Sequence, residues 1–409
     1  MKKTTVKKYA KLIVRVGANV QKGQSVMISC STDQADFCAI VVDECYKAGA
    51  KYVTVDWNND KLSKLHYRNQ SIKMLSTVFP WQEEKIKWAS KELPCRIAII
   101  SDDPDGMKGV DPIKVQKSSV SRYKVLKPYT EAMESRHQWT IAAVPGEAWA
   151  KKVFPGLRTS LAVEKLWQAI LETVYVTDDN DPIEVWKKVN ADFKERCRKL
   201  NEDRFEYLTY KSSNGTDFKV WLTPKSLWCG GGETDLNGHF FNPNMPTIEV
   251  FTTPKSGMAE GKLVSTKPLS YRGQLIENFS FTFHEGKVVK VEAEKGQDIL
   301  EEMIKSDEGA CMIGEVALVP QNSPISNQNI LYYETLFDEN ASCHVALGRG
   351  YSDCIEGYGD MTRDELKELG VNESMIHVDF MVGSPDLCIV GHTYDGRDIE
   401  VMRDGNFVI

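Results

Sequence analysis

The sequence predicts two domains, an α/β N-terminal domain with a mainly parallel sheet and an α+β C-terminal domain. Three observations support this prediction: a length of 409 residues, alternating strand and helix patterns in the first half, and hairpin patterns in the second half. A chain of this length usually exceeds what one hydrophobic core organises. We expect residues 1–185 to form the first domain and residues 186–409 to form the second.

Strand-like and helix-like segments alternate through the first half of the chain. Apolar residues recur at helical spacing in residues 6–16, and a second helical pattern over residues 33–50 ends at a glycine. The sequence further predicts strands at residues 24–30 (QSVMISC), 51–57 (KYVTVDW), 95–101 (CRIAIIS) and 139–146 (WTIAAVPG), and helices at residues 85–92 and near 129–137. Such alternation is typical of a parallel sheet covered by helices.

The second half has a different character. An amphipathic helix is expected at residues 182–202 as a connector between the domains. Alternating strands then surround Asn214-Gly215, and a second pair surrounds Glu285-Gly286, which are turn sequences of antiparallel hairpins. A short helix and several short strands follow, so an α+β domain is predicted.

Charge and cysteine usage exclude several classes of protein. The net charge of −7 argues against a dominant nucleic-acid or anionic-membrane surface. No apolar run approaches the length of a membrane span, and the basic N-terminus lacks the apolar core of a signal peptide. The ten cysteines form no C-x-x-C pair and most lie in apolar surroundings. We therefore expect a cytoplasmic protein with reduced thiols and with neither a nucleic acid nor a membrane as partner.

Acidic and histidine side chains of the second half occur in apolar or turn contexts. The candidates are Glu249 in NMPTIEVFTTP, Glu315 in MIGEVALVP, Glu339, His344 and Tyr351 in TLFDENASCHVALGRGY, and His377 and Asp379 in HVDFMVG. Glu315 follows a glycine and precedes VALV, so its carboxylate should lie at a strand end or within a sheet. A carboxylate in that position requires a cation or several hydrogen-bond donors.

His377 and Asp379 are two residues apart, so a strand would direct both side chains to one face. The apolar remainder of the stretch would then pack on the opposite face. A hydrogen bond between the two side chains in the core explains the pair as well as a shared metal ion does.

Three carboxylates and two imidazoles form a donor set that suits zinc, cobalt or manganese better than calcium. The set Glu249, Glu315, His344, His377 and Asp379 has about the size that a pair of ions needs. Its members come from separate segments, so no spacing rule proves a site. The alternative is that each is an ordinary core or turn residue, and Glu339 in particular suits a turn or a helix cap.

Taken together, the segments around these residues resemble the M29 family of metallo-aminopeptidases, the aminopeptidase T, aminopeptidase S and aminopeptidase II group. The resemblance rests on NMPTIEVFTTP, GEVALVP, LFDENASCHVALGRGY and HVDFMVGSPDL in this order, and on the N-terminal segments KYAKLIVRVGANVQKGQSVMI and YKAGAKYVTVDW. It covers essentially the whole chain. Each segment alone is weakly specific, but the collinear set is specific.

The resemblance implies a cytoplasmic, homodimeric exopeptidase that removes N-terminal residues from peptides with a free N-terminus. It implies two divalent ions per chain (zinc, cobalt or magnesium, with manganese as a further option) held by the C-terminal domain. The implied ligands are Glu249, Glu315, His344, His377 and Asp379, with Glu315 as the bridge and Glu339 as ligand or neighbour. Glu249 or Glu315 would accept a proton, and Tyr351 would assist catalysis.

Two positions depart from the family's pattern. Ile248 replaces the first acid of a common PTEEV segment, and Gly350 replaces an alanine before Tyr351. The first change removes a nearby charge, and the second would loosen the loop of Tyr351. The alternatives to an aminopeptidase are a metal-dependent hydrolase of another amide or ester and a non-catalytic α/β binding protein.

Overall fold

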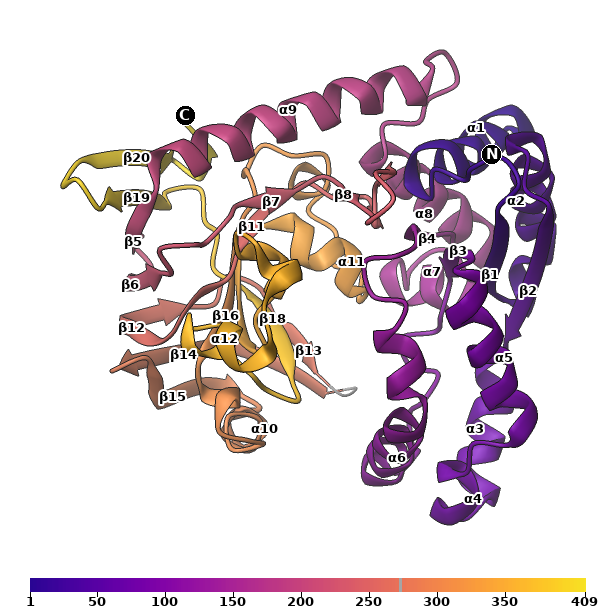
Figure 1. Ribbon diagram of the computed structural model, residues 1–409, viewed down its shortest axis with the longest axis horizontal. Helices are drawn as coiled ribbons and strands as arrows, with labels where there is room; N and C mark the ends of the chain where they lie inside the picture. Colours follow the sequence, from indigo (N-terminus) through magenta and orange to yellow (C-terminus); the bar gives the residue numbers. More distant parts are fainter. Residues whose placement is uncertain (272–273) are drawn as a thin grey trace. The chain divides into compact units, whose positions relative to one another are not determined.

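The computed structural model in Figure 1 describes residues 1–271 and 274–409. The chain forms two compact units, one of Met1–Lys188 with Gly232–Pro246 and the other of Val189–Gly231 with Thr247–Ile409. The segment Gly232–Pro246, which lies in the second half of the sequence, therefore belongs to the first unit. The domain boundary at residue 185 stays a prediction.

The first unit is built on a five-stranded parallel sheet in the order β10-β4-β3-β1-β2. Its strands are β1 (Ser25–Ser31), β2 (Tyr52–Asn58), β3 (Cys95–Ile100), β4 (Trp139–Ala143) and β10 (Asn244–Met245). This confirms the predicted parallel sheet and the strands expected from the first half of the sequence. The short strand β10 comes from the later segment and pairs with β4 through Asn244 opposite Ile141.

The first unit has helices next to this sheet and others, α3, α4 and α6, that project away from it (Figure 1). They are α1 (Lys3–Leu12), α2 (Ala35–Ala48), α3 (Asp60–Asn69), α4 (Ile72–Ser76), α5 (Pro80–Glu92), α6 (Pro112–Glu131), α7 (Glu147–Val153) and α8 (Thr159–Thr173). The rings of Tyr9, Phe37 and Trp167 bring α1, α2 and α8 together, with centroids 5.7–6.4 Å apart. Helix α2 ends at Gly49, whose φ of 99° suits the left-handed cap that glycine favours.

The helix predicted near residues 129–137 is misplaced. Helix α6 ends at Glu131, three residues beyond its internal Pro128, and residues 132–137 form turns in which Ser135 has a φ of 57°. Several apolar side chains of α6, including Ile113 and Tyr123, are exposed. Because they do not gather on one buried face, hydrophobic periodicity gives little sign of this helix.

The second unit consists of two antiparallel sheets. The smaller sheet has the order β18-β17-β16-β11-β7, and the larger has the order β13-β14-β12-β6-β5-β19-β20-β21, with β15 paired to β14. The smaller sheet contains β7 (Cys229–Gly230), β11 (Val250–Thr252), β16 (Ile313–Leu318), β17 (His344–Gly348) and β18 (His377–Met381). The larger contains β5 (Phe205–Lys211), β6 (Asp217–Leu222), β12 (Pro254–Val264), β13 (Leu269–Tyr271), β14 (Gln274–His284), β15 (Lys287–Lys295), β19 (Cys388–Thr393), β20 (Asp398–Arg403) and β21 (Asn406–Phe407).

Both predicted hairpins occur, as β5–β6 and β14–β15. The helices of this half are α9 (Pro182–Asp203), which continues from the first unit into the second, α10 (Gln297–Met303), α11 (Thr335–Asp338) and α12 (Arg363–Glu368). The remaining short strands, β8 (Glu233–Thr234) and β9 (Phe240–Phe241), pair with each other in the first unit.

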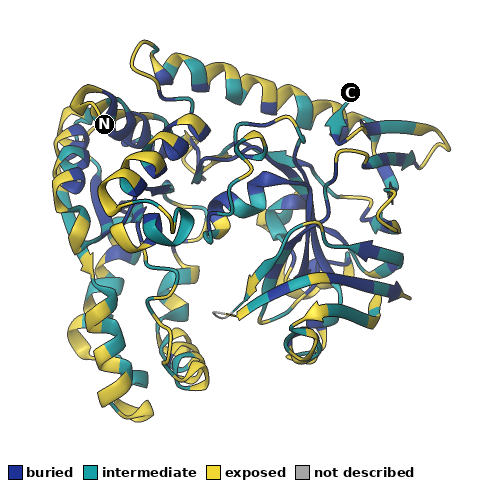
Figure 2. Ribbon diagram, turned by 180° about the vertical axis from the view of Figure 1, so that it is seen from behind, coloured by how far each residue is buried: buried dark blue, intermediate teal, exposed yellow. Residues whose placement is uncertain are grey.

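One apolar core lies between the two sheets of the second unit, and β16 and β17 are buried along their whole length, as the dark blue inner strands of Figure 2 show. Phe380 of β18 packs edge to face on Phe281 of β14 at 5.0 Å and approaches Phe279 at 6.0 Å. Val345 and Leu347 of β17 join the same core. Apolar residues at alternate positions of β17 and β18 thus fix one face of each strand, and the intervening residues must face the other way.

Shortening Phe380 to alanine should lower the free energy of unfolding by about 3–5 kcal/mol, because the side chain is 1% exposed and its loss leaves a cavity. Urea titration followed by circular dichroism measures the change. Val289→Ala is the matched control, since Val289 of β15 is 61% exposed. Equal effects of the two substitutions would contradict this description of the core.

Candidate metal centre

The predicted donor residues come together on one face of the smaller sheet of the second unit. Glu315 lies within β16, His344 begins β17, and His377 and Asp379 belong to β18. Glu249 directly precedes β11. Four neighbouring strands or strand ends therefore supply these five side chains. The expectation that the Glu315 carboxylate lies at a strand end or within a sheet is confirmed.

Strand register explains why the carboxylates of Glu315 and Asp379 face each other. Ala346 of β17, the strand between β16 and β18, pairs with Glu315 on one side and with Asp379 on the other. Cross-strand neighbours share a face, so the small side chain of Ala346 leaves space between two acidic ones. Gly348, which pairs with His377 two residues further along β17, leaves similar space.

A β-bulge at Gly314 directs Glu315 toward this face. Ile313 pairs with Leu347 and Glu315 pairs with Ala346, so β16 has one extra residue at this point. Simple alternation would place Glu315 on the same face as Ile313, which belongs to the apolar core. A Cβ atom at Gly314 would lie 2.2 Å from the carbonyl oxygen of Gly348, so only glycine fits the bulge.

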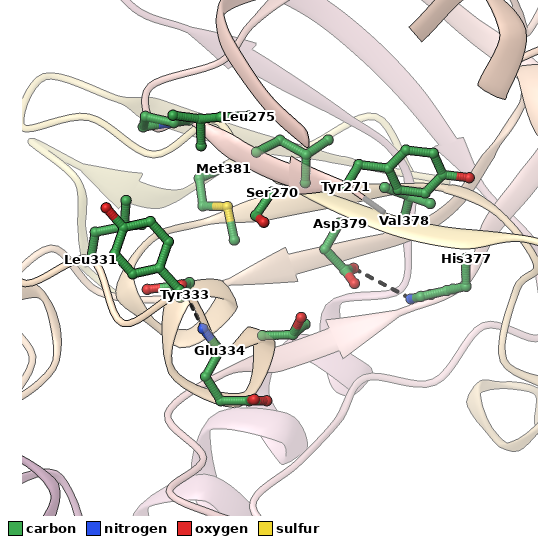
Figure 3. A pocket seen from close by; sticks show the side chains of 14 residues that line it. Ser270, Tyr271, Leu275, Leu331, Tyr333, Glu334, His377, Val378, Asp379 and Met381 are labelled. Carbon is green, nitrogen blue, oxygen red and sulfur yellow. Dashed lines mark hydrogen bonds and ion pairs between the residues drawn. The ribbon is translucent and has the colours of Figure 1, made fainter. Parts of the chain in front are cut away.

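The two imidazoles approach the carboxylates through their Nε2 atoms. His344 Nε2 lies 3.2 Å from Glu249 Oε2, and His377 Nε2 lies 3.1 Å from Glu315 Oε2 and 3.3 Å from Asp379 Oδ1. Figure 3 shows the contact between His377 and Asp379. The same-face prediction for these two residues is confirmed.

Backbone carbonyl groups orient both histidine rings. His344 Nδ1 lies 3.1 Å from the carbonyl oxygen of Ser342, and His377 Nδ1 lies 2.7 Å from that of Arg349. When Nδ1 carries the proton that binds a carbonyl oxygen, Nε2 is free to act as a ligand. This is the arrangement that commonly orients histidine ligands of metal ions.

Burial and mutual repulsion perturb the acid–base properties of the cluster. Burial, together with the charges of Asp379 and Glu249, raises the pKa of Glu315 to about 7. Burial lowers the pKa of His344, but the neighbouring Glu249 outweighs this and raises it to about 10. In the same way, Asp379 and Glu315 raise the pKa of His377 to about 11. The carboxylates therefore attract positive charge, which either protons or a metal ion can supply.

Two buried oxygens favour a metal ion as the source of that charge. Glu249 Oε2 and Asp379 Oδ1 have no hydrogen-bond partner among the described residues, although an imidazole nitrogen lies near each. One donor atom from each of Glu315, His344 and Asp379 also lies within 4.8 Å of the others. Buried polar atoms are rarely left unpaired, and this mixture of nitrogen and oxygen donors fits a divalent transition metal.

Tyr351 borders the cluster. Its hydroxyl group lies 3.2 Å from His377 Nε2, and its ring packs on Phe251 with centroids 5.5 Å apart. Thr253 holds its backbone in both directions, because Thr253 Oγ1 accepts from Tyr351 N at 2.7 Å and donates to Tyr351 O at 2.8 Å. These hydrogen bonds hold the backbone of Tyr351 next to Gly350, and the looser loop expected from Gly350 stays a prediction. Burial raises the pKa of Tyr351 far above its ordinary value, so the phenol stays protonated.

Glu339 begins a short 3₁₀-helix beside the cluster. Burial and the charges of Glu249 and Asp379 raise the pKa of the Glu339 carboxyl group well above its ordinary value. Glu339 therefore lies within electrostatic reach of both of these residues. The next residue, Asn340, is fully buried and accepts a hydrogen bond from the backbone N–H of Ile248 at 2.7 Å. Neither Asn340 nor Thr253 could be predicted from the sequence, because their partners are distant along the chain.

A cavity of about 210 Å³ adjoins the cluster (Figure 3). His377 and Asp379 line it together with apolar side chains that include Leu331, Tyr333 and Met381. The expectation that all the apolar residues of HVDFMVG pack on the opposite face is therefore wrong for Met381. Met381 is two residues from Asp379 and shares its face, so its side chain lines the cavity next to the donor atoms.

Within the part of the chain that the structure describes, no helix is long and apolar enough to cross a membrane.

A buried set of carboxylates and imidazoles with unpaired oxygens, placed beside a cavity, defines a candidate metalloenzyme. Residues 2–407 match the model of the family described as thermophilic metalloprotease (M29), and the chain belongs to this family. The match confirms the family that the sequence motifs indicate.

The relatives carry aminopeptidase names. Aminopeptidase AmpS of Bacillus subtilis is 42% identical over 400 residues, which cover 98% of this chain and 97% of that protein. Aminopeptidase T of Thermus thermophilus is 36% identical over 408 residues, which cover 100% of this chain and 99% of that protein.

Solved structures agree with the fold. The structure of wild-type AmpT from Thermus thermophilus matches with a TM-score of 0.92 at 36% identity and covers 100% of both chains. A 2,5-dihydroxypyridine dioxygenase from Pseudomonas putida matches with a TM-score of 0.53 at 13% identity, over 99% of this chain and 96% of that one, and so shares only the fold.

Asp379→Asn should weaken the binding of Co²⁺ or Zn²⁺ by about 100-fold or more, because it removes a charged ligand rather than a residue that merely orients one. Isothermal titration calorimetry of chelator-treated protein measures the affinity. His284→Ala is the control, since His284 pairs with Glu260 on the surface of the same unit. Unchanged metal affinity of Asp379→Asn would exclude Asp379 as a ligand.

Proposed function

We propose that this M29 family member is a metal-dependent aminopeptidase, and that the donor cluster of the second unit is its active site. In this proposal Glu249, Glu315, His344, His377 and Asp379 hold two divalent cations, and Glu339 is a further ligand or a direct neighbour. The observation that carries the proposal is the row in which Glu315 and Asp379 flank Ala346, with both histidine Nε2 atoms directed at the same space.

Glu315 is the proposed bridging ligand. It lies within contact of His377, and it also groups with His344 and Asp379 in one compact set of donor atoms. Asp379 shares both of these relations, so the position of Glu315 in the sheet distinguishes it. Its position in the second of the neighbouring strands, between Glu249 beside β11 and Asp379 on β18, supports a role shared by two ions.

Bound divalent cations would polarise the scissile carbonyl group and acidify a water molecule. The residues of the chain would do the rest. Glu249 or Glu315 would accept the proton of the attacking water, since both carboxylates lie in the cluster and burial keeps competing solvent away. Tyr351, whose phenol stays protonated, would donate a hydrogen bond to the developing oxyanion.

Negative charge at the site suits a peptide with a free N-terminus. Beyond the donor Asp379, whose charge the bound cations would offset, the cavity is lined by the carboxylates of Glu334 and Asp338. An α-ammonium group would be attracted to such surroundings, whereas an acylated N-terminus would gain nothing from them. This requirement would restrict cleavage to the N-terminal residue.

The identity of the ions, the oligomeric state and the location of the protein belong to the same proposal. The ions would be zinc, cobalt or magnesium, with manganese as a further option, and the protein would be a cytoplasmic homodimer. Metal analysis of purified protein and light scattering would test the first two of these points.

Glu315→Gln should reduce kcat/KM for leucine p-nitroanilide by about 10³-fold or more while the protein stays folded, because glutamine preserves shape but cannot bridge two cations or accept a proton. Steady-state kinetics with circular dichroism as a folding check measure this effect. The control is Glu277→Gln, which removes an acid that pairs with Lys295 on the surface of β14. A near-normal rate for Glu315→Gln would refute the assignment of this residue.

Removal of metal should abolish hydrolysis, and re-addition of Co²⁺ or Zn²⁺ should restore it, because the donor cluster alone supplies no electrophile. N-acetyl-leucine p-nitroanilide should resist cleavage by the metal-loaded protein. A rate unaffected by chelation would favour a metal-free hydrolase. Cleavage of the acetylated substrate at a comparable rate would instead indicate a metal-dependent hydrolase of another amide.

A further inference from the structure

The cavity beside the donor cluster has a wall of apolar side chains. Leu269, Leu331, Tyr333 and Met381 contribute to this wall, while His377 and Asp379 form the part next to the donors. In Figure 3, Leu331 and Tyr333 lie at the opposite end of the view from His377. An apolar cavity of about 150 Å³ is enough to bind benzene, so a volume of about 210 Å³ accommodates an aromatic or branched aliphatic side chain.

Tyr333 occupies this wall in a strained backbone conformation. Its φ is 57°, in the left-handed region that bulky side chains rarely adopt. Such a conformation costs about 1–3 kcal/mol and persists only where the surrounding structure enforces it. A tyrosine in this backbone conformation requires contacts that enforce it. Its position beside the proposed active site suggests that the conformation has a functional role.

Asp338 is the structural cause. Its Oδ1 accepts a hydrogen bond from the backbone N–H of Tyr332 at 2.8 Å, and its Oδ2 accepts one from that of Glu334 at 3.1 Å. The two residues that flank Tyr333 are therefore fixed by one carboxylate. The ring of Tyr332 also stacks on Phe337 at 4.5 Å, which anchors the segment to helix α11.

We propose that Tyr333 determines a preference for a large apolar side chain on the N-terminal residue of the peptide, and that Asp338 is the positioning residue that presents Tyr333 to the cavity. This inference rests on the proposed aminopeptidase function.

Charge indicates which residue of the peptide the cavity takes. Beyond the donor Asp379, Glu334 and Asp338 line it, and no lysine or arginine is among the described lining residues. The cation next to this lining, Lys267, is within electrostatic reach of Asp338, which offsets its charge. The α-ammonium group accompanies the N-terminal residue, whereas a site for the C-terminal end of a short peptide would need a cation for the carboxylate. The cavity therefore fits the N-terminal side chain.

The test compares p-nitroanilides of phenylalanine, leucine and alanine, which differ only in the N-terminal side chain. The wild-type protein should favour phenylalanine and leucine over alanine. Tyr333→Asn should lower the ratio of kcat/KM for phenylalanine to that for alanine by about tenfold, since an aromatic contact is lost. Asparagine tolerates the left-handed conformation, so the backbone is preserved.

The chain offers a matched control in Tyr175, which has a φ of 56° and lies in the first unit. Tyr175→Asn makes the same chemical change in the same backbone conformation and should leave the ratio unchanged. Asp338→Ala should lower the ratio as Tyr333→Asn does, while Asp338→Asn, which retains one acceptor oxygen, should restore part of it. A merely structural role for Asp338 would lower all rates together and leave the ratio constant.

An active wild-type protein whose substrate ratio does not respond to Tyr333→Asn would overturn the inference and leave the proposed function intact. If the metal-loaded wild-type protein hydrolyses none of these substrates, the proposed function fails. Calorimetric titration with free L-phenylalanine and L-alanine then decides the subsite. Tighter binding of phenylalanine that Tyr333→Asn abolishes would support it, and equal binding would overturn it.

Discussion

Repulsion between buried carboxylates is the constraint on which the second unit depends. Glu249, Glu315 and Asp379 are brought to one face of a sheet whose other face is an apolar core. Removing even one such charge from water costs several kcal/mol unless a partner compensates it. The nearby carboxylates raise the pKa values of His344 and His377, so protons on the imidazoles can compensate part of the charge. A divalent cation would replace those protons with a stronger and more directional partner, and the unpaired oxygens are placed to accept it.

The backbone, more than the side chains, holds this arrangement. The bulge at Gly314 turns Glu315 away from the core, and the carbonyl groups of Ser342 and Arg349 orient the two imidazoles. Thr253 secures Tyr351 through its main chain. Backbone groups of strands cannot rotate freely, so donors fixed by them reach the geometry of a site before any ion binds. Phe380, on the core face of β18, contributes in the same way by locking the strand that carries His377 and Asp379.

The sequence predicts local features of this site well and long-range ones poorly. Alternation alone places His377 and Asp379 on one face, and a glycine before an apolar run marks Glu315 as unusual. Neither observation reveals that Ala346 separates the two acids, because that fact depends on the register of three strands that are far apart in the chain. In the first unit, the parallel strands are evident from their apolar runs. Strand β10 is not, because two residues carry no pattern and their partner β4 lies about a hundred positions earlier.

At the two positions where the sequence departs from the expected motif, the structure shows support from the main chain. The side chain of Ile248 is buried. The residue contributes to the site through its backbone N–H group, which donates a hydrogen bond to Asn340. Gly350 sits where an added Cβ would lie 3.0 Å from Thr253 and 3.2 Å from the carbonyl oxygen of Gly314, so glycine relieves crowding at the point where Tyr351 is held. Because the main chain carries the support in both places, the side chain can vary while the donor geometry is maintained. The expected ligands act through their side chains, so no backbone group can take their place.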